Sequence, residues 1–233
     1  MTDAPGPTTS VAMQDPVYVA AVVDLLAVIA YGEISAFERL AEDSKLAPSL
    51  GDKAALAGMA ATEFFHFRRI SGRLRELGVD PIEAMLDFVE PLDGFHERTA
   101  PSDWYESLIK AYVGEGLVAD FYREIAEFLD VDTRTLIVES LDDADQASFA
   151  VARIREGIAA DPRLGGRLAL FGRRLMGEAL SQAQRVAAER DALAGLLAGG
   201  VDRPGMDLAA IGRLFNRLTE NHTNRMEKLG LHA

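Results

Sequence analysis

The chain contains no cysteine in its 233 residues. Without thiols it has no disulfide bond, no thiol nucleophile and no cysteine-ligated metal. This absence fits a reducing compartment. Residues 1–15 also lack the basic and apolar segments of a signal peptide. We therefore predict a cytoplasmic protein.

Basic residues are scarce: 24 lysines and arginines stand against 37 acidic residues, and the formal net charge is −13. Such a surface repels phosphate backbones, which argues against broad binding of nucleic acid. The segment from residue 163 to residue 190 is an exception, because it carries six arginines and two glutamates. Its arginines are either a solvated helix face, the commoner case, or a contact for a tRNA backbone.

Long uninterrupted apolar runs are also missing. The longest, residues 17–30, contains Asp24 and is too short to cross a bilayer. We interpret it as a buried bundle helix and predict no membrane partner.

Strand-like alternation is absent, and helical periodicity fills the chain, so we predict an all-α fold. Residues 1–14 are predicted to be a disordered tail, and residues 15–233 a single domain. One long connection, residues 79–101, contains three prolines and has room for a short helix over residues 81–88. The main helices are expected over residues 16–44, 50–77, 102–129, 133–159, 162–197 and 207–229.

Ionisable residues interrupt the apolar stripes of the first two predicted helices. Glu33 lies on the stripe of the first helix, and Glu63 and His66 lie on the stripe of the second. The spacing of Glu63 and His66 places both on one helix face, one turn apart. A buried carboxylate without a partner is costly. The pattern therefore predicts either a metal site or a buried hydrogen-bond network.

The second half of the chain repeats this pattern. Glu115 precedes Asp145 by the same spacing as Glu33 precedes Glu63. Ser148 stands where the second motif would carry its histidine. We interpret this as an internal duplication of a helix pair, in which the second Glu-x-x-His has become Asp-x-x-Ser.

The duplicated pattern resembles the di-iron carboxylate bundles of the ferritin-like superfamily, which take one Glu from each of two helices and one Glu-x-x-His from each of the others. Within it, the chain looks most like the branch similar to the tRNA hydroxylase that acts on the isopentenyl group of 2-methylthio-isopentenyladenosine. The closer likeness is carried by residues 31–33, 63–67, 113–116 and 177–184. The resemblance implies a four-helix bundle over residues 16–159, a long crossover from helix 2 to helix 3, and two additional C-terminal helices.

The resemblance also implies a set of metal ligands. One metal would take Glu33 and His66, with Glu63 bridging, and the other would take Glu115, with Asp145 in the second bridging position. Such a carboxylate-rich set suits two iron ions, with manganese as the alternative. The cofactor expected here is therefore iron.

Here the chain departs from the hydroxylase pattern. Ser148 supplies no imidazole, and Asp145 is one methylene shorter than Glu, so the second metal position should be weaker. Asp142, one turn earlier, is a substitute ligand or, more commonly, a solvated acid.

Three functions follow from these observations. The first is a non-haem di-iron monooxygenase that acts on tRNA or on a small molecule, with an unidentified electron donor. The second is an inactive ferritin-like binding or scaffold protein, and the third is an iron-binding ferroxidase. A homo-oligomer is compatible with each.

The remaining aromatic residues and histidines are assigned structural places. Trp104, Tyr112 and Tyr122 are interpreted as core aromatics rather than as a channel lining or an electron relay. His96, His222 and His232 are expected on the surface.

Overall fold

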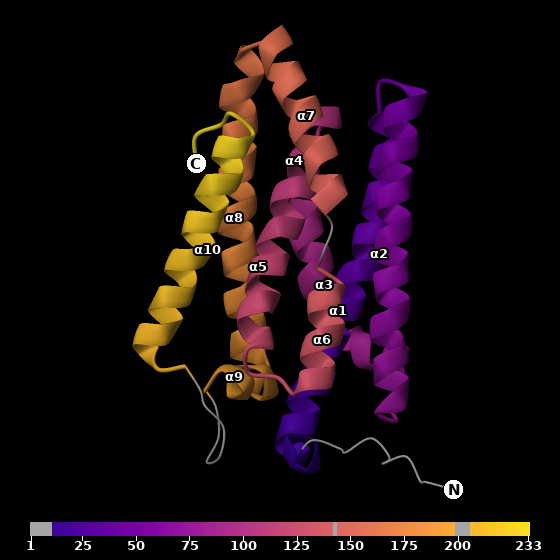
Figure 1. The fold of residues 1–233 in the computed structure, drawn as a ribbon, viewed down its shortest axis with the longest axis vertical. Helices are drawn as coiled ribbons and strands as arrows, with labels where there is room; N and C mark the ends of the chain where they lie inside the picture. Colours follow the sequence, from indigo (N-terminus) through magenta and orange to yellow (C-terminus); the bar gives the residue numbers. More distant parts are fainter. Residues whose placement is uncertain (1–10, 142–143, 199–205) are drawn as a thin grey trace, which may run out of the picture.

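The computed structural model describes residues 11–141, 144–198 and 206–233, and every regular element within them is helical (Figure 1). The all-α prediction is confirmed. Residues 1–10 of the predicted tail and the expected turns at residues 199–200 and 204–205 lie outside the described residues. In chain order, the helices are α1 (Pro16–Asp43), α2 (Leu50–Glu76), α3 (Pro81–Arg98), α4 (Trp104–Ile109), α5 (Glu115–Ala126), α6 (Val131–Glu139), α7 (Ala144–Ala160), α8 (Arg163–Glu189), α9 (Asp191–Ala198) and α10 (Leu208–Lys228).

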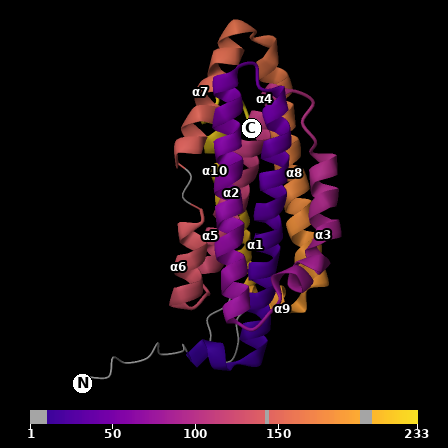
Figure 2. The same ribbon diagram turned by 90° about the vertical axis from the view of Figure 1, so that its right-hand side faces the viewer.

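Helices α1 and α2 form a long antiparallel pair (Figure 2). The side chain of Asp15 accepts a hydrogen bond from the Val17 amide, with Pro16 in the first turn of α1. Ser49 caps α2 in the same way, by accepting a hydrogen bond from the Asp52 amide. Helix α2 ends before Gly78, whose φ of 77° is favourable for glycine. Both helices agree with their predicted ranges.

Helix α1 is the core helix of this pair. Together with the turn that follows, it is, among the described residues, the one helix long and apolar enough to span a membrane by length and composition. The expectation of a run too short to span was based on residues 17–30 alone, and the helix continues well beyond them. Half of its most apolar window is buried inside the fold. Because α1 packs against α2, α3 and α9, its apolar surface is explained by the bundle core.

The crossover contains a longer helix than predicted. Helix α3 continues to Arg98 and includes Pro91, whereas the sequence predicted a helix over residues 81–88 only. Met85 and Phe88 are buried, and Leu92 packs beside them. Packing of this apolar stripe against α1 and α8 keeps the segment helical beyond the proline.

The third and fourth bundle helices are both interrupted, although each was predicted as one helix. A π-helical turn, Lys110–Gly114, joins α4 to α5. The fourth helix is divided into α6, which ends at Glu139, and α7, which begins at Ala144. Two ion pairs connect these parts to α2: Arg153 to Asp52 at 2.7 Å, and Arg69 to Glu139 at 2.5 Å.

The predicted C-terminal helices are present, and the first of them is divided into α8 and α9. Helix α10 packs on α5 and α8 (Figure 1). Arg225 hydrogen-bonds to the carbonyl of Gly116 and pairs with Asp120, so that a Cβ at Gly116 would collide with its side chain. Met226 lies against Gly172 in the same manner. Two glycines thus make room for neighbouring side chains of α10.

The apolar core consists of two clusters. One includes Leu40 of α1 and Ala60 of α2, together with much of α4, α8 and α10. The other includes Ala30 of α1 and Ile70 of α2. Both helices therefore pass from one apolar cluster to the other over a short interval, and the ionisable residues of the sequence pattern lie in that interval.

Candidate metal centre

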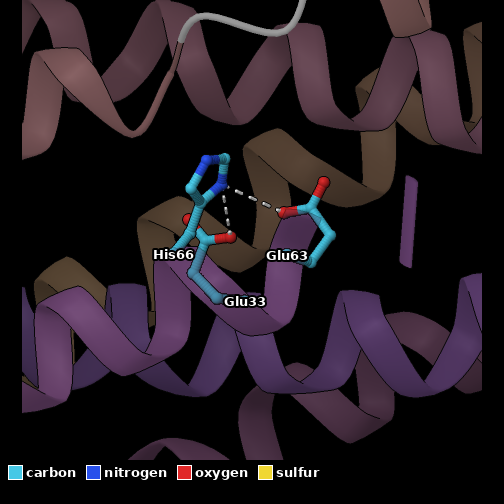
Figure 3. A group of neighbouring side chains, drawn as sticks. All are labelled: Glu33, Glu63 and His66. Atoms are coloured by element: carbon cyan, nitrogen blue, oxygen red, sulfur yellow. Dashed lines mark ion pairs between the residues drawn. The ribbon is translucent and has the colours of Figure 1, made fainter. Parts of the chain in front are cut away.

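Glu33, Glu63 and His66 converge between the two apolar clusters (Figure 3). Glu33 comes from the middle of α1, and the other two come from the facing side of α2. One ligand atom from each residue lies within 4.8 Å of the others. The structure thus brings the three predicted residues together, and their role as metal ligands stays a prediction.

The imidazole stands between the two carboxylates. Nδ1 of His66 lies 3.6 Å from Oε2 of Glu33 and 3.6 Å from Oε2 of Glu63. These distances exceed those of an N–H···O hydrogen bond, about 2.7–3.2 Å. Nδ1 of His66 and Oε1 of Glu63 are buried and have no hydrogen-bond partner. Buried polar atoms without partners are rare and costly, so these two atoms are candidate ligands for a cation.

The electrostatics of the cluster point the same way. Burial raises the pKa of Glu33 well above its usual value, and the proximity of Glu63 raises it further while His66 opposes the shift. The carboxylates of Glu33 and Glu63 together raise the pKa of His66 to about 10. Without a metal, the proton on the imidazole therefore supplies the positive charge.

A metal ion fits these residues. Two ligands on one divalent ion, at about 2.0–2.2 Å each, are separated by about 3–3.6 Å at usual coordination angles. The observed 3.6 Å separations agree with that geometry. Two carboxylates and one imidazole are a donor set suited to Fe(II) or Mn(II).

Tyr122 completes the surroundings of Glu33. It is buried on α5, and burial together with the negative charge of Glu33 raises its pKa. The phenol therefore stays protonated beside the carboxylate. Trp104 is likewise buried and Tyr112 packs against the core, as predicted for core aromatics.

The residues predicted for the second metal position are placed differently. Glu115 is half-buried at the first residue of α5, directly after the π-helical turn, and is not part of the cluster of ligand atoms. Asp145 lies in the first turn of α7, and its side chain is outside the described part of the structure, as is Asp142. Ser148 is exposed rather than facing the interior. The role of Glu115 and Asp145 as ligands remains a prediction.

Two of the three histidines expected on the surface are not there. His96 is half-buried on α3 rather than in a loop, and His222 is buried on α10. His232 is exposed, as predicted. The apolar spacing of Leu218, His222 and Met226 along α10 is the sequence signal that identifies His222 as an inward residue.

Comparison with known proteins supports the superfamily. Residues 16–200 match the family described as "Ferritin-like domain, actinomycetes", a range that ends before α10. A solved structure of a Synechococcus protein, described as having aldehyde deformylating oxidase activity, is similar with a TM-score of 0.71 and 19% identity over 94% of each chain. That likeness shows a shared ferritin-like fold. None of the curated proteins matches the chain.

Proposed function

The chain belongs to the family of actinomycete ferritin-like domains, and on that premise we propose that it is an O₂-dependent di-iron oxidase or oxygenase. The observation that carries the proposal is the convergence of Glu33, Glu63 and His66 with two buried ligand atoms that lack partners. The Synechococcus protein of similar fold is described by an oxidase activity, which agrees with this class of chemistry.

The residues have distinct roles in this proposal. Glu33 and His66 would hold one iron from facing helices. Oε2 of Glu63 lies 3.6 Å from the same imidazole, and the buried Oε1 of Glu63 has no hydrogen-bond partner, so Glu63 would also help to hold the metal. Glu115 and Asp145 would be ligands of a second ion. When bound, the iron pair supplies the reduction of O₂ needed for substrate oxidation.

The surrounding residues control water and protons. The apolar clusters on both sides of the site exclude water from it. Tyr122 keeps its proton, because burial and the charge of Glu33 raise its pKa. These features belong to the chain itself and do not depend on which divalent ion is bound.

We propose a small organic molecule as the substrate in preference to tRNA. The tRNA hydroxylase-like assignment is based on short motifs, and the net charge of −13 opposes it. Five of the six arginines between residues 163 and 190 also bind groups of the same chain. These arginines are Arg163, Arg167, Arg173, Arg174 and Arg190.

The proposal is tested by counting metal. Purified protein is loaded anaerobically with Fe(II), desalted and measured by plasma mass spectrometry, beside His66→Ala and the exposed-histidine control His232→Ala. We expect about two irons per chain for the wild type, none for His66→Ala, and the wild-type content for His232→Ala. Loaded wild-type protein should then consume O₂. Wild-type protein that takes up no iron would refute the proposal.

A metal-free scaffold is the second candidate, and the exposure of Ser148 favours it. In that case Glu63→Gln should leave function in cells unchanged and raise the melting temperature, because it removes a buried charge. Under the oxidase proposal, the same variant loses iron and loses function.

A further inference from the structure

A second group of ionisable side chains lies beside the metal centre, toward the end of α1. Arg39 and Asp43 come from α1, His96 comes from α3, and Lys110 begins the π-helical turn. We call Arg39, His96 and Lys110 the nitrogen cluster. None of these three residues belongs to the metal centre, and none is a proposed iron ligand.

Lys110 is half-buried without a close counter-ion. Its Nζ donates a long hydrogen bond of 3.4 Å to the backbone carbonyl of His96. Among the described residues, no carboxylate oxygen lies within 4.0 Å of Nζ. A partly buried ammonium group in this state is costly, because it has lost water and gained no ion pair.

The two neighbouring side chains also carry unused nitrogen atoms. Nε of Arg39 and Nδ1 of His96 are buried and have no hydrogen-bond partner. Nη1 of Arg39 has only a distant carboxylate, that of the exposed Glu42 at 3.8 Å. The Arg39 side chain is itself 36% exposed, so the cluster is open to solvent on that side.

The charges of the group leave room for an anion. Burial lowers the pKa of Lys110 to about 8, with Asp43 opposing the shift, so the ammonium is largely protonated at neutral pH. Burial and the charges of Lys110 and Arg39 lower the pKa of His96 to about 3, which leaves its imidazole neutral. Burial raises the pKa of Asp43 to about 6. Two cations therefore lie near one half-buried carboxylate, that of Asp43, and near the exposed Glu42, which is 3.8 Å from Arg39.

The cluster is within reach of the metal centre. Arg39 is six residues beyond Glu33 on α1, which corresponds to about 9 Å along the helix axis. Lys110 precedes Glu115 by one π-helical turn. A molecule of moderate length can place one end at each site.

We propose that Arg39, His96 and Lys110 bind the anionic group, a carboxylate or a phosphate, of the small molecule that is oxidised at the metal centre. The link to oxidation rests on the proposed function. Binding of the anion does not, and it can be measured on protein without iron.

The test uses iron-free protein, with decanoate and inorganic phosphate as probes. Trp104, the single tryptophan of the chain, is 7% exposed and lies on the helix that leads to Lys110, so its fluorescence reports binding. Lys110→Met keeps the length of the side chain and removes its charge, and Lys53→Met on exposed Lys53 is the matched control. We expect at least about tenfold weaker binding for Lys110→Met, from the loss of a charge-assisted hydrogen bond, and no change for Lys53→Met.

Each outcome decides the proposal. Binding of decanoate alone identifies a carboxylate site, and binding of phosphate alone identifies a phosphate site. Absence of both, or equal affinity in Lys110→Met and wild type, overturns the anion site. Arg39→Met, with the same expected loss, replaces Lys110→Met if circular dichroism shows that the latter is unfolded.

The orientation of the ligand is tested with Mn(II) in place of iron. In nuclear magnetic resonance spectra, the methyl protons of bound decanoate should relax faster than the protons beside its carboxylate, because the methyl end lies nearer the metal. The reverse order would place the carboxylate at the metal and overturn the proposal. Anion binding by a chain that takes up no iron would instead refute the proposed function and leave the anion site intact.

Discussion

The helix pair α1 and α2 is continuous, whereas the pair formed by α4–α5 and α6–α7 is interrupted in both of its members. The continuous pair brings a carboxylate from α1 to a carboxylate and an imidazole on α2. In the interrupted pair, Glu115 follows a π-helical turn and Ser148 faces solvent. Two segments with the same sequence spacing therefore present their side chains differently.

The cause of this difference is helix geometry. In a continuous helix, residues three or four apart share a face. A π-helical turn inserts a residue into the turn, and a break between two helices removes the fixed angular relation altogether. Sequence spacing therefore predicts which side chains converge on α1 and α2, but it does not predict this for the second pair.

The largest expected difference between the two helix pairs is in how much each contributes to iron binding. Glu33→Gln should abolish iron uptake, because it removes a ligand from the convergent cluster. Asp145→Asn should lower the content by at most one of about two ions. Both are measured by plasma mass spectrometry after Fe(II) loading. Equal losses in the two variants would show that the pairs contribute equally.

The next largest effect is on the free energy of unfolding, through the ion pair that connects α10 to α5 of the interrupted pair. The side chains of Arg225 and Asp120 are 11% and 12% exposed, so Arg225→Met removes the closest partner of the Asp120 carboxylate and leaves only Arg123, at 3.6 Å. Because Arg123 compensates part of the charge, we expect a loss of at most about 3–5 kcal/mol in the free energy of unfolding, measured with urea. Arg217→Met, which breaks a more exposed ion pair with Glu124 on the same two helices, should cost less than about 1 kcal/mol.

A third effect contrasts the histidines of the two regions. His66 is held charged by carboxylates, whereas His96 stays neutral down to a pKa of about 3, compared with 6.5 in the unfolded chain. Between these values His96 binds more protons in the unfolded state. The contribution of His96 to stability should therefore fall as the pH drops below 6.5, by at most about 1.4 kcal/mol per pH unit. Urea titrations at pH 7 and pH 5 should show a smaller fall for His96→Gln than for wild type or His232→Gln.

A smaller effect distinguishes two glycines next to Glu115. A Cβ at Gly114 would meet no atom within 4 Å, whereas a Cβ at Gly116 would collide with Arg225. Gly114→Ala should therefore stabilise the protein by about 1 kcal/mol, since alanine is the better helix former. Gly116→Ala should destabilise it. Thermal unfolding measures both, and a gain in both would mean that Arg225 is not fixed against α5.

The smallest expected effect is on Ser148. Because this residue is exposed, Ser148→His should restore the sequence motif without adding a metal ligand. Iron content and affinity should equal those of the wild type. A rise in either would show that the interrupted pair can be completed from its sequence position alone.

Much of the fold was predictable from local signals. Asp15, Ser49 and Gly78 mark the ends of α1 and α2, and the apolar stripes mark their buried faces. The confluence of Glu33 with Glu63 and His66 followed from those stripes. The length of α3 was not predictable from Pro91, because packing of Phe88 and its neighbours outweighs the missing hydrogen bond.

The residues that escaped prediction depend on contacts between distant segments. His96 was predicted in a surface loop, and Lys110 had no predicted role, because nothing near either of them in sequence shows that the Lys110 side chain reaches the backbone of α3. The role of Arg225 likewise depends on tertiary structure, because its side chain packs against Gly116, which is distant in sequence.

The amino-acid sequence was enough to predict the helical class, the pairing of α1 with α2, and the three residues that meet between them, because spacing within a continuous helix decides which side chains share a face. The interruptions of the second pair, the packing of α10, and the group of Arg39, His96 and Lys110 became visible only in the folded chain. Those features arise from packing between residues far apart in the chain, and the local periodicity of the sequence does not predict such packing.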